Sequence, residues 1–452
     1  MSQFALRSQR VITPEGIRAA TVKINDGVIE AVLPHNENPG CTVEDLGNQV
    51  LMPGLVDTHV HINEPGRTDW EGFNTATQAA AAGGITTLVD MPLNCIPVTI
   101  NKQALHEKME AVVDKLWVDV GFWGGVIPDS VDDLDELLSA GVLGVKSFLI
   151  DSGIEEFPNM TEEDLRKAMP ILAKHNAPYL IHAELDSEDT EPPVIGDSYQ
   201  TFLESRPKQW ENDAIDLMIK LTRELKQEGH HCKTHIVHLS SAEALENISA
   251  ARSEGLGVSA ETCPHYLTLF SENIPDGKTL FKCCPPIREN SNREQLWQAI
   301  KDGVIDFIVS DHSPCTPQLK HIDSGDVEKA WGGISALQFG LPLIWTDALD
   351  RGFELEEVSR LMSAATADFA GLGHIKGRIA ESYHADLLVF NDGAEYLISN
   401  DMIKHRHKIT PYEGKAVVGE VMATYLRGTK VFENDQFVTG PAGQPLLKGN
   451  LK

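Results

Sequence analysis

The chain has 452 residues, of which 42% are hydrophobic, and 67 Asp and Glu against 38 Lys and Arg give a net charge of −29. This length is more than one small core needs, so we expect one large domain with a smaller companion. So acidic a surface repels nucleic acid and anionic membranes and favours solubility.

The cysteines also bear on where the protein works. There are seven, they are scattered, and none forms a C-x-x-C pair, which favours a reducing compartment over a disulfide framework. No run approaches 18 apolar residues, and no apolar stretch follows Arg7 and Arg10 to complete a secretory signal. We therefore expect a cytoplasmic protein, with a short mitochondrial presequence as the alternative.

The two ends of the chain have similar patterns. Residues 4–12, 19–24 and 28–32 are short and β-like, and Asn25-Asp26-Gly27 is a hairpin signal between the last two. The C-terminal β-like segments are residues 385–390, 416–426 and 429–433. We expect residues 1–52 and 383–452 to form one small β-sandwich together, and the alternative is two independent hairpins.

Between the ends, apolar runs alternate with amphipathic stretches. The expected strands are 51–61, 85–91, 119–126, 142–150, 179–183, 234–239, 257–262 and 307–311. The expected helices are 101–116, 161–175, 210–228, 242–254 and 293–302. This alternation favours an α/β fold, a (β/α)8 TIM-like barrel over residues 53–382, rather than a doubly wound sheet. Such barrels build their sites at the C-terminal ends of the strands.

The first of these strands ends in Asp57-Thr58-His59-Val60-His61. Side chains two apart on a strand point to the same side, so His59 and His61 can bind one metal ion together. Two such histidines alone are more often surface or core residues. The other strand ends decide between these interpretations.

Ionisable residues recur at four further strand ends, namely Lys146, His182, His238 and Asp311. Taken singly, each histidine could be a satisfied core residue, and Asp311 could cap the following loop. His235 is a better candidate for a satisfied histidine, because it is three residues from His238 and cannot share its strand face. Residues of this kind at one rim predict a metal site.

Lys146 is the hardest of the set to explain as packing, because an unpaired buried ammonium is expensive. A neutral lysine can add carbon dioxide to become a carbamate. The two carbamate oxygens could then bridge two ions about 3.5–4 Å apart.

The order His-x-His, Lys, His, His, Asp in a barrel-plus-sandwich pattern resembles the cyclic amidohydrolase branch of the amidohydrolase superfamily, over nearly the whole chain. The resemblance implies two divalent ions, zinc first with manganese, cobalt or nickel as alternatives, and N6-carboxylysine at Lys146. It places one ion on His59, His61, Lys146 and Asp311, and the other on Lys146, His182 and His238. It also implies a homo-oligomer, a tetramer. Asp57 resembles an outer-shell position, and His312 has no assigned role.

Several loops are similar to those of the allantoinases within this branch. These are residues 64–72 (EPGRTDWEG), 311–315 (DHSPC), 329–334 (KAWGGI), 405–408 (HRHK) and 411–412 (PY). The resemblance implies hydrolysis of the hydantoin ring of allantoin to allantoate. Asp311 would take the proton of the attacking water and return it to the leaving ring nitrogen.

Asn63 separates this expectation from the dihydroorotase alternative. Dihydroorotases have arginine there to hold a substrate carboxylate, whereas asparagine suits a neutral amide. Asn63, Cys284 and Gly332 are therefore the candidate substrate contacts. A hydantoinase or dihydropyrimidinase acting on another cyclic ureide is the closest alternative, and a non-catalytic scaffold relative is a second one.

Overall fold

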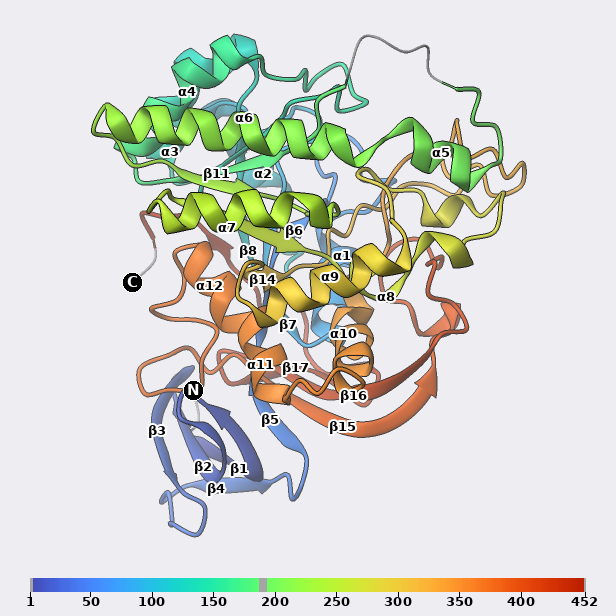
Figure 1. Cartoon of the computed structure of the whole chain (residues 1–452). Coiled ribbons are helices and arrows are strands. Elements are labelled where there is room, and N and C mark those ends of the chain that lie inside the picture. The colour runs from blue at the N-terminus through green and yellow to red at the C-terminus, as the bar shows by residue number, and fades with distance from the viewer. Residues whose placement is uncertain (1–2, 187–192, 451–452) are drawn as a thin grey trace.

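The structure, a computed structural model, describes residues 3–186 and 193–450. A barrel of strands and helices occupies the centre of the molecule, and strands from both ends of the chain lie together beside it (Figure 1). Among these residues, no helix is both long and apolar enough to cross a bilayer.

The barrel strands are parallel and follow the chain order. They are β6 (Leu55–Val60), β7 (Ile85–Asp90), β8 (Asp119–Phe122), β9 (Gly124–Gly125), β10 (Val145–Phe148), β11 (Pro178–His182), β12 (Lys233–Ile236), β13 (Val258–Thr262) and β14 (Phe307–Ile308). β9 continues β8, since Trp123 N donates to Asp90 O and Gly124 N donates to Gly144 O. The ring closes where Val60 bridges His312 and His61 N donates to His312 O at 2.8 Å. The predicted (β/α)8 barrel is confirmed.

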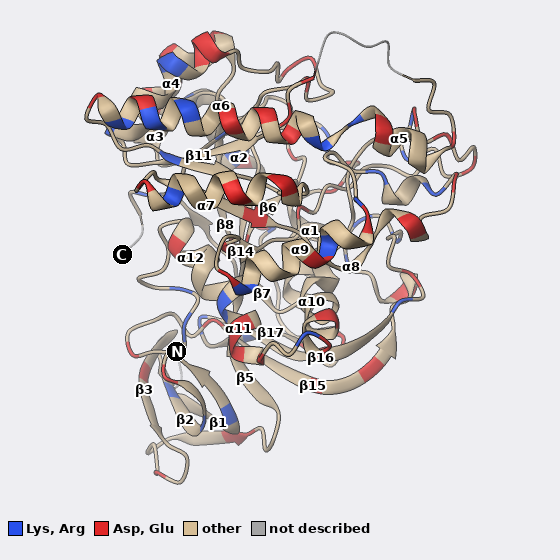
Figure 2. Cartoon of the chain, in the orientation of Figure 1, with Lys and Arg blue, Asp and Glu red and all other residues tan. Residues whose placement is uncertain are grey.

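Helices follow the strands and cover the barrel. They are α1 (Phe73–Ala82), α2 (Lys102–Ala111), α3 (Leu134–Ala140), α4 (Glu162–Lys174), α5 (Tyr199–Ser205), α6 (Lys208–Gln227), α7 (Leu245–Ser253), α8 (Pro264–Thr268), α9 (Asn290–Lys301), α10 (Gly340–Leu349), α11 (Leu355–Ser359) and α12 (Ala365–Phe369). Each of the five predicted amphipathic stretches overlaps one of them, namely α2, α4, α6, α7 and α9. α4, α6 and α7 bear charged residues on their outer sides (Figure 2). The sequence did not predict α1, because it is buried on most sides and its polar stripe is narrow.

Strands from both termini form one sheet, which has nine strands within the described residues. Its members are β1 (Phe4–Thr13), β2 (Gly16–Asn25), β3 (Val28–Pro34), β4 (Thr42–Asp45), β5 (Val50–Pro53), β15 (Leu387–Leu397), β16 (Ala416–Leu426), β17 (Thr429–Glu433) and β18 (Gln436–Phe437), in the order β18-β17-β16-β15-β5-β1-β2-β3 with β4 also on β1. β5 therefore joins the N-terminal strands to the C-terminal ones. The predicted hairpin turn lies between β2 and β3, where Asp26 and Gly27 have φ of 50° and 85°. A last short strand, β19 (Pro445–Leu446), pairs with β8 of the barrel.

The predicted strand 51–61 is wrong in one respect, because it is two strands divided at Gly54. β5 pairs with β1 and β15 in the terminal sheet, whereas β6 belongs to the barrel. A side chain at Gly54 would place its Cβ 2.3 Å from Thr86 Oγ1, so only glycine lets the chain turn here. Domain boundaries after residues 52 and 382 stay a proposal. The strand β5 extends one residue beyond the first of them, to Pro53.

A buried ionic network joins the base of the barrel to the terminal sheet. Asp119, the first residue of β8, accepts hydrogen bonds from Lys376 Nζ at 2.9 Å and Arg427 Nη1 at 2.5 Å. Lys376 Nζ also lies 2.5 Å from Asp386 Oδ2. The polar groups of this network therefore satisfy one another without help from outside.

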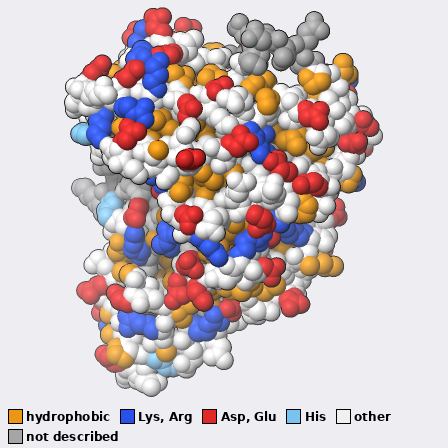
Figure 3. All heavy atoms as spheres, viewed as in Figure 1, with side chains coloured by type: hydrophobic (Ala, Val, Ile, Leu, Met, Phe, Trp, Pro, Cys, Tyr) orange, Lys and Arg blue, Asp and Glu red, His pale blue; other side chains and the backbone are white. Residues whose placement is uncertain are grey.

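The outer surface is mixed in charge. In the view of Figure 3, acidic and basic side chains are interspersed with scattered apolar ones.

Candidate metal centre at the barrel rim

His59, His61 and Asp311 meet at the C-terminal end of the barrel. The two imidazole rings are 5.6 Å apart, and their Nε2 atoms lie 3.3 and 3.6 Å from Asp311 Oδ1. All three side chains are buried. The i and i+2 spacing thus places both histidines on one side of the strand, beside the predicted carboxylate.

A buried carboxylate orients His59. His59 Nδ1 contacts Glu261 Oε1, and the other oxygen of Glu261 lies 3.0 Å from His235 Nε2. Although burial acts to raise the pKa of Glu261, His59 and His235 lower it to about 2. Glu261 is therefore an anion that holds Nδ1–H of His59 and leaves Nε2 to face Asp311. His235 has its second hydrogen bond from Ser259, so it is a satisfied histidine.

Lys146 lies inside β10 with 1% of its surface exposed. Its Nζ lies 5.0 Å from the centre of the Phe148 ring and, among the described residues, forms no hydrogen bond. Burial lowers the pKa of Lys146 to about 7, although Asp311 and Glu261 act to raise it. A substantial fraction of this amine is therefore neutral near neutral pH.

His182 and His238 face each other across the site, with ring centres 4.6 Å apart. His182 stacks on Phe148, and its Nε2 lies 2.7 Å from Glu184 Oε2, while no described residue bonds to its Nδ1. His238 Nδ1 is buried and has no hydrogen-bond partner among the described residues. The two rings therefore present unpaired nitrogens to one region of the rim.

These donors fit a divalent metal ion. Burial lowers the pKa of His182 to about 4 and those of His61 and His238 well below the usual value, so each imidazole is neutral and can act as a ligand. Unpaired buried nitrogens such as His59 Nε2 are costly unless something binds them. Neutral imidazoles with a carboxylate are a ligand set for zinc and related ions.

The backbone at the C-terminal rim of the barrel also has unusual geometry. His238 and Asp311 have φ of 38° and 42°, a conformation that residues with side chains rarely adopt. Asp57 accepts hydrogen bonds from His59 N and Ser310 N, each at 3.1 Å. Asp57 thus positions the strand ends from beneath, in agreement with the expectation that it is not a ligand.

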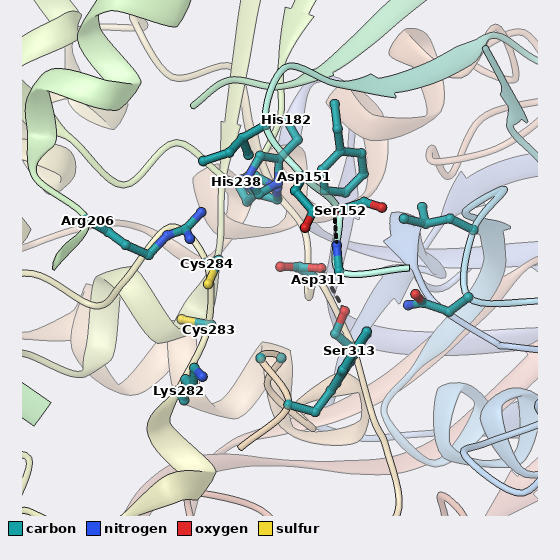
Figure 4. A pocket seen from close by; sticks show the side chains of 18 of the residues that line it. Asp151, Ser152, His182, Arg206, His238, Lys282, Cys283, Cys284, Asp311 and Ser313 are labelled. Atoms are coloured by element: carbon teal, nitrogen blue, oxygen red, sulfur yellow. Dashed lines mark hydrogen bonds between the residues drawn. The ribbon is translucent and has the colours of Figure 1, made fainter. Parts of the chain in front are cut away.

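A pocket of about 550 Å³ opens over these groups (Figure 4). Cys284 and Gly332 line it, and their contact with substrate stays a prediction. Asn63 is different: it is 1% exposed, it is not among the lining residues, and its amide donates to Pro314 O at 3.1 Å. Its Oδ1 has no hydrogen-bond partner among the described residues, and the backbone is left-handed here (φ 66°), so the contact of Asn63 with substrate stays a prediction. The lining residues include His61, Asn94, Lys146, His182, Arg206, His238, Lys282, Cys284, Asp311, Ser313, Trp331 and Gly332.

The loops that suggested the resemblance pack against one another around this pocket. Trp70 meets Trp331 edge-on with ring centres 5.0 Å apart, and Arg406 N donates to Glu71 at 3.1 Å. His312 Nδ1 accepts from Ala336 N at 3.2 Å, so Nε2 carries the proton and points toward Glu71. His312 therefore belongs to this supporting layer and not to the pocket wall.

Sequence reasoning missed three residues of the site: Glu184, Arg206 and Glu261. Glu261 had a signal, since it is a lone carboxylate inside the predicted strand 257–262. Glu184 follows His182 by two residues, which places it on the same side. Arg206 had no signal, because α5 was not predicted.

A closed (β/α)8 barrel with buried imidazoles and a carboxylate at its C-terminal rim defines the class of metal-dependent barrel hydrolases. The chain belongs to the amidohydrolase family, whose model matches residues 50–431. It is 49% identical to an allantoinase of Streptomyces avermitilis, over 99% of both chains. It is 47% identical to the allantoinase of Saccharomyces cerevisiae, over 90% of this chain and 88% of the relative. Among solved structures, an L-hydantoinase (dihydropyrimidinase) from Arthrobacter aurescens superposes with a TM-score of 0.90 at 26% identity, covering 99% of this chain and all of the other.

Proposed function

We propose that this protein is an allantoinase, which hydrolyses the ring amide of allantoin to give allantoate. The observation that carries the proposal is full-length similarity: 49% identity to an allantoinase, against 26% to a hydantoinase of the same fold. The pocket over His61, Lys146 and Asp311 supplies a place for the reaction. A chain with this complete residue set is an enzyme and not a scaffold relative.

The site residues are proposed to hold two divalent ions, zinc or one of manganese, cobalt and nickel. The unpaired nitrogens His59 Nε2 and His238 Nδ1 support this proposal. One ion would be held by His59, His61, Lys146 and Asp311, and the other by Lys146, His182 and His238. Bound there, the ions would supply the Lewis acidity that makes water a nucleophile near neutral pH.

Lys146 is proposed to serve as a carbamate. Its neutral amine attacks the carbon of carbon dioxide, a C–N bond forms as one C–O π bond opens, and one proton is released, which leaves an anionic carbamate in place of the neutral amine. The lowered pKa of Lys146 and its lack of a hydrogen-bond partner among the described residues support this step. The carbamate would also offset the positive charge of ions held there.

A side chain of the protein itself then transfers the proton. Asp311 accepts a proton from the attacking water, whose oxygen adds to the ring carbonyl carbon. When the ring C–N bond breaks, Asp311 returns that proton to the leaving nitrogen. Burial raises the pKa of Asp311, which suits a carboxylate that must hold a proton between the two steps.

One comparison of substrates tests the function. Metal-loaded protein is given allantoin, hydantoin, dihydrouracil and dihydroorotate, and kcat/KM is measured for each. Allantoin should exceed the analogues that lack its ureido arm by up to about 10⁴-fold, because a site built to bond a group rejects ligands without it. If hydantoin or dihydrouracil equals allantoin, the hydantoinase alternative takes the place of this proposal.

Metal analysis and solution mass test the remaining parts. Elemental analysis should find up to two transition-metal ions per chain, and exhaustive chelation should remove activity. Full activity in metal-free protein would contradict the metal proposal. The expected homotetramer stays a prediction, which light scattering checks.

A further inference from the structure

Arg206 is a cation in the pocket wall that the reaction described above does not use. It follows α5 directly and extends into the cavity that Asp311 also lines (Figure 4). Its side chain is 20% exposed, and its guanidinium lies over Trp210, 5.6 Å from the ring centre. The group is thus fixed in place but still reaches the pocket.

The charge of Arg206 is already compensated within the protein. Its Nε and Nη2 donate to the two oxygens of Glu184 at 3.1 and 2.6 Å. With this bidentate partner, Arg206 offers the pocket directed N–H donors with little net charge.

One edge of the guanidinium remains unused. Nη1 donates to no residue among those described, whereas Nε and Nη2 are held by Glu184. Lys282, another cation of the pocket wall, differs because its Nζ donates to Glu328 O at 2.8 Å. Lys282 also keeps N–H donors, since an ammonium has three, but Arg206 presents its unused edge from a planar group that Glu184 and Trp210 hold in place.

We propose that Arg206 Nη1 donates a hydrogen bond to the carbonyl oxygen of the ureido arm of allantoin, and so determines the preference for allantoin over hydantoin. This inference rests on the proposed function. A neutral carbonyl suits a guanidinium whose charge is already paired, whereas a carboxylate would have to compete with Glu184. The ring amide reacts beside Asp311, which leaves the arm to reach another wall of the same pocket.

The test measures a ratio of substrates, because Arg206 also holds Glu184 and, through it, His182. Arg206→Lys and Arg206→Gln are compared with the unchanged protein on allantoin and hydantoin, with bound metal quantified in each. Damage to His182 lowers kcat/KM for both substrates by a common factor. Loss of the arm contact should lower the allantoin-to-hydantoin ratio by a further 10- to 100-fold, on the order expected for a hydrogen bond to a charged donor.

Lys282→Gln is the matched control, since it removes a neighbouring cation whose ammonium is engaged by a backbone carbonyl. It should leave the ratio unchanged. An unchanged ratio in both Arg206 variants would overturn the inference, as would a fall in the ratio for Lys282→Gln alone.

A measurement on the unchanged protein covers the case in which the variants do not fold. 5-Propylhydantoin has an arm of similar length without a carbonyl, and it should be hydrolysed no faster than hydantoin. If it matches allantoin, the inference is overturned while the proposed function stands. If allantoin itself is not hydrolysed, the proposed function fails first.

Discussion

The two ends of the barrel differ in whether their buried ionisable side chains have bonding partners. At the base, Lys376 is fully buried and lies 2.9 Å from Asp119 and 2.5 Å from Asp386. At the rim, Lys146 is equally buried but has no hydrogen-bond partner among the described residues, and nearby histidines keep unpaired nitrogens. The charged groups at the base thus bond to one another, whereas the amine and imidazoles at the rim keep groups to which a ligand could bind.

This difference also distinguishes two clusters of side chains that are both close enough to be metal ligands. Asp119, His384 and Asp386 approach one another closely enough to be metal ligands, as do His59, His61 and Asp311. At the base, Lys376 and Arg427 already neutralise the two carboxylates. At the rim no such cation is bonded to Asp311 among the described residues, so the geometry favours a metal there and not at the base.

The largest effect on kcat/KM is expected from replacing Lys146, the buried lysine at the rim. Lys146→Met should reduce kcat/KM on the order of 10⁴-fold, because the bridge between the ions is lost. The free energy of unfolding should stay the same or rise, since an apolar side chain suits a site without a partner. Activity assays and calorimetry check both parts.

Lys146→Ala provides the control for the chemistry of the bridge. A short carboxylic acid should partly restore its activity by occupying the vacated space, and Lys146→Arg should not be restored. An unmodified amine at Lys146 in the active, metal-loaded enzyme would contradict the carbamate.

The same substitution at the base should have the reverse outcome. Lys376→Met leaves Asp119 and Asp386 without this buried partner, and should lower the free energy of unfolding by about 3–5 kcal/mol. The kcat/KM of the folded protein should change little. Loss of catalysis without loss of stability would contradict the contrast between the two ends.

Glu261→Gln tests how the rim is oriented. Its carboxylate holds His59, so the variant should bind metal about 10- to 100-fold more weakly, as competition with a chelator measures. Glu211→Gln is the matched control, because Glu211 is a buried carboxylate bonded to Arg288 at 2.7 Å instead of to a candidate ligand. Equal metal affinity in both variants would remove the orienting role of Glu261.

The smallest effect concerns acid stability at the base. Burial acts to raise the pKa of Asp119, but Lys376 and Arg427 lower it below its unfolded value of 3.8. The stability that Asp119 contributes is therefore complete above pH 3.8 and is lost as the pH falls through the lowered folded-state pKa. Asp119→Asn should cost about 1–3 kcal/mol at pH 7, and the difference from the unchanged protein should shrink below pH 3.8. A difference that does not depend on pH would contradict this account.

The sequence predicted the barrel and the rim residues because both follow from local rules. Strand periodicity places His59 and His61 on one side, and parallel strands bring their C-terminal ends together. Arg206 and Glu261 could not be assigned in this way, because their roles depend on partners distant in the chain. The division at Gly54 was also hidden, since the apolar run on both sides of it is continuous and only the approach of Thr86 requires a glycine.

The position of β5 has a consequence for synthesis. β5 leads directly into the strand that carries His59, yet it pairs with β15, which the ribosome makes near the end of the chain. Until β15 emerges, the nascent protein holds the residues of the rim but has a bare strand edge beside them, and such edges promote aggregation. A chain that stops at residue 383 should therefore aggregate even though every proposed metal ligand is present.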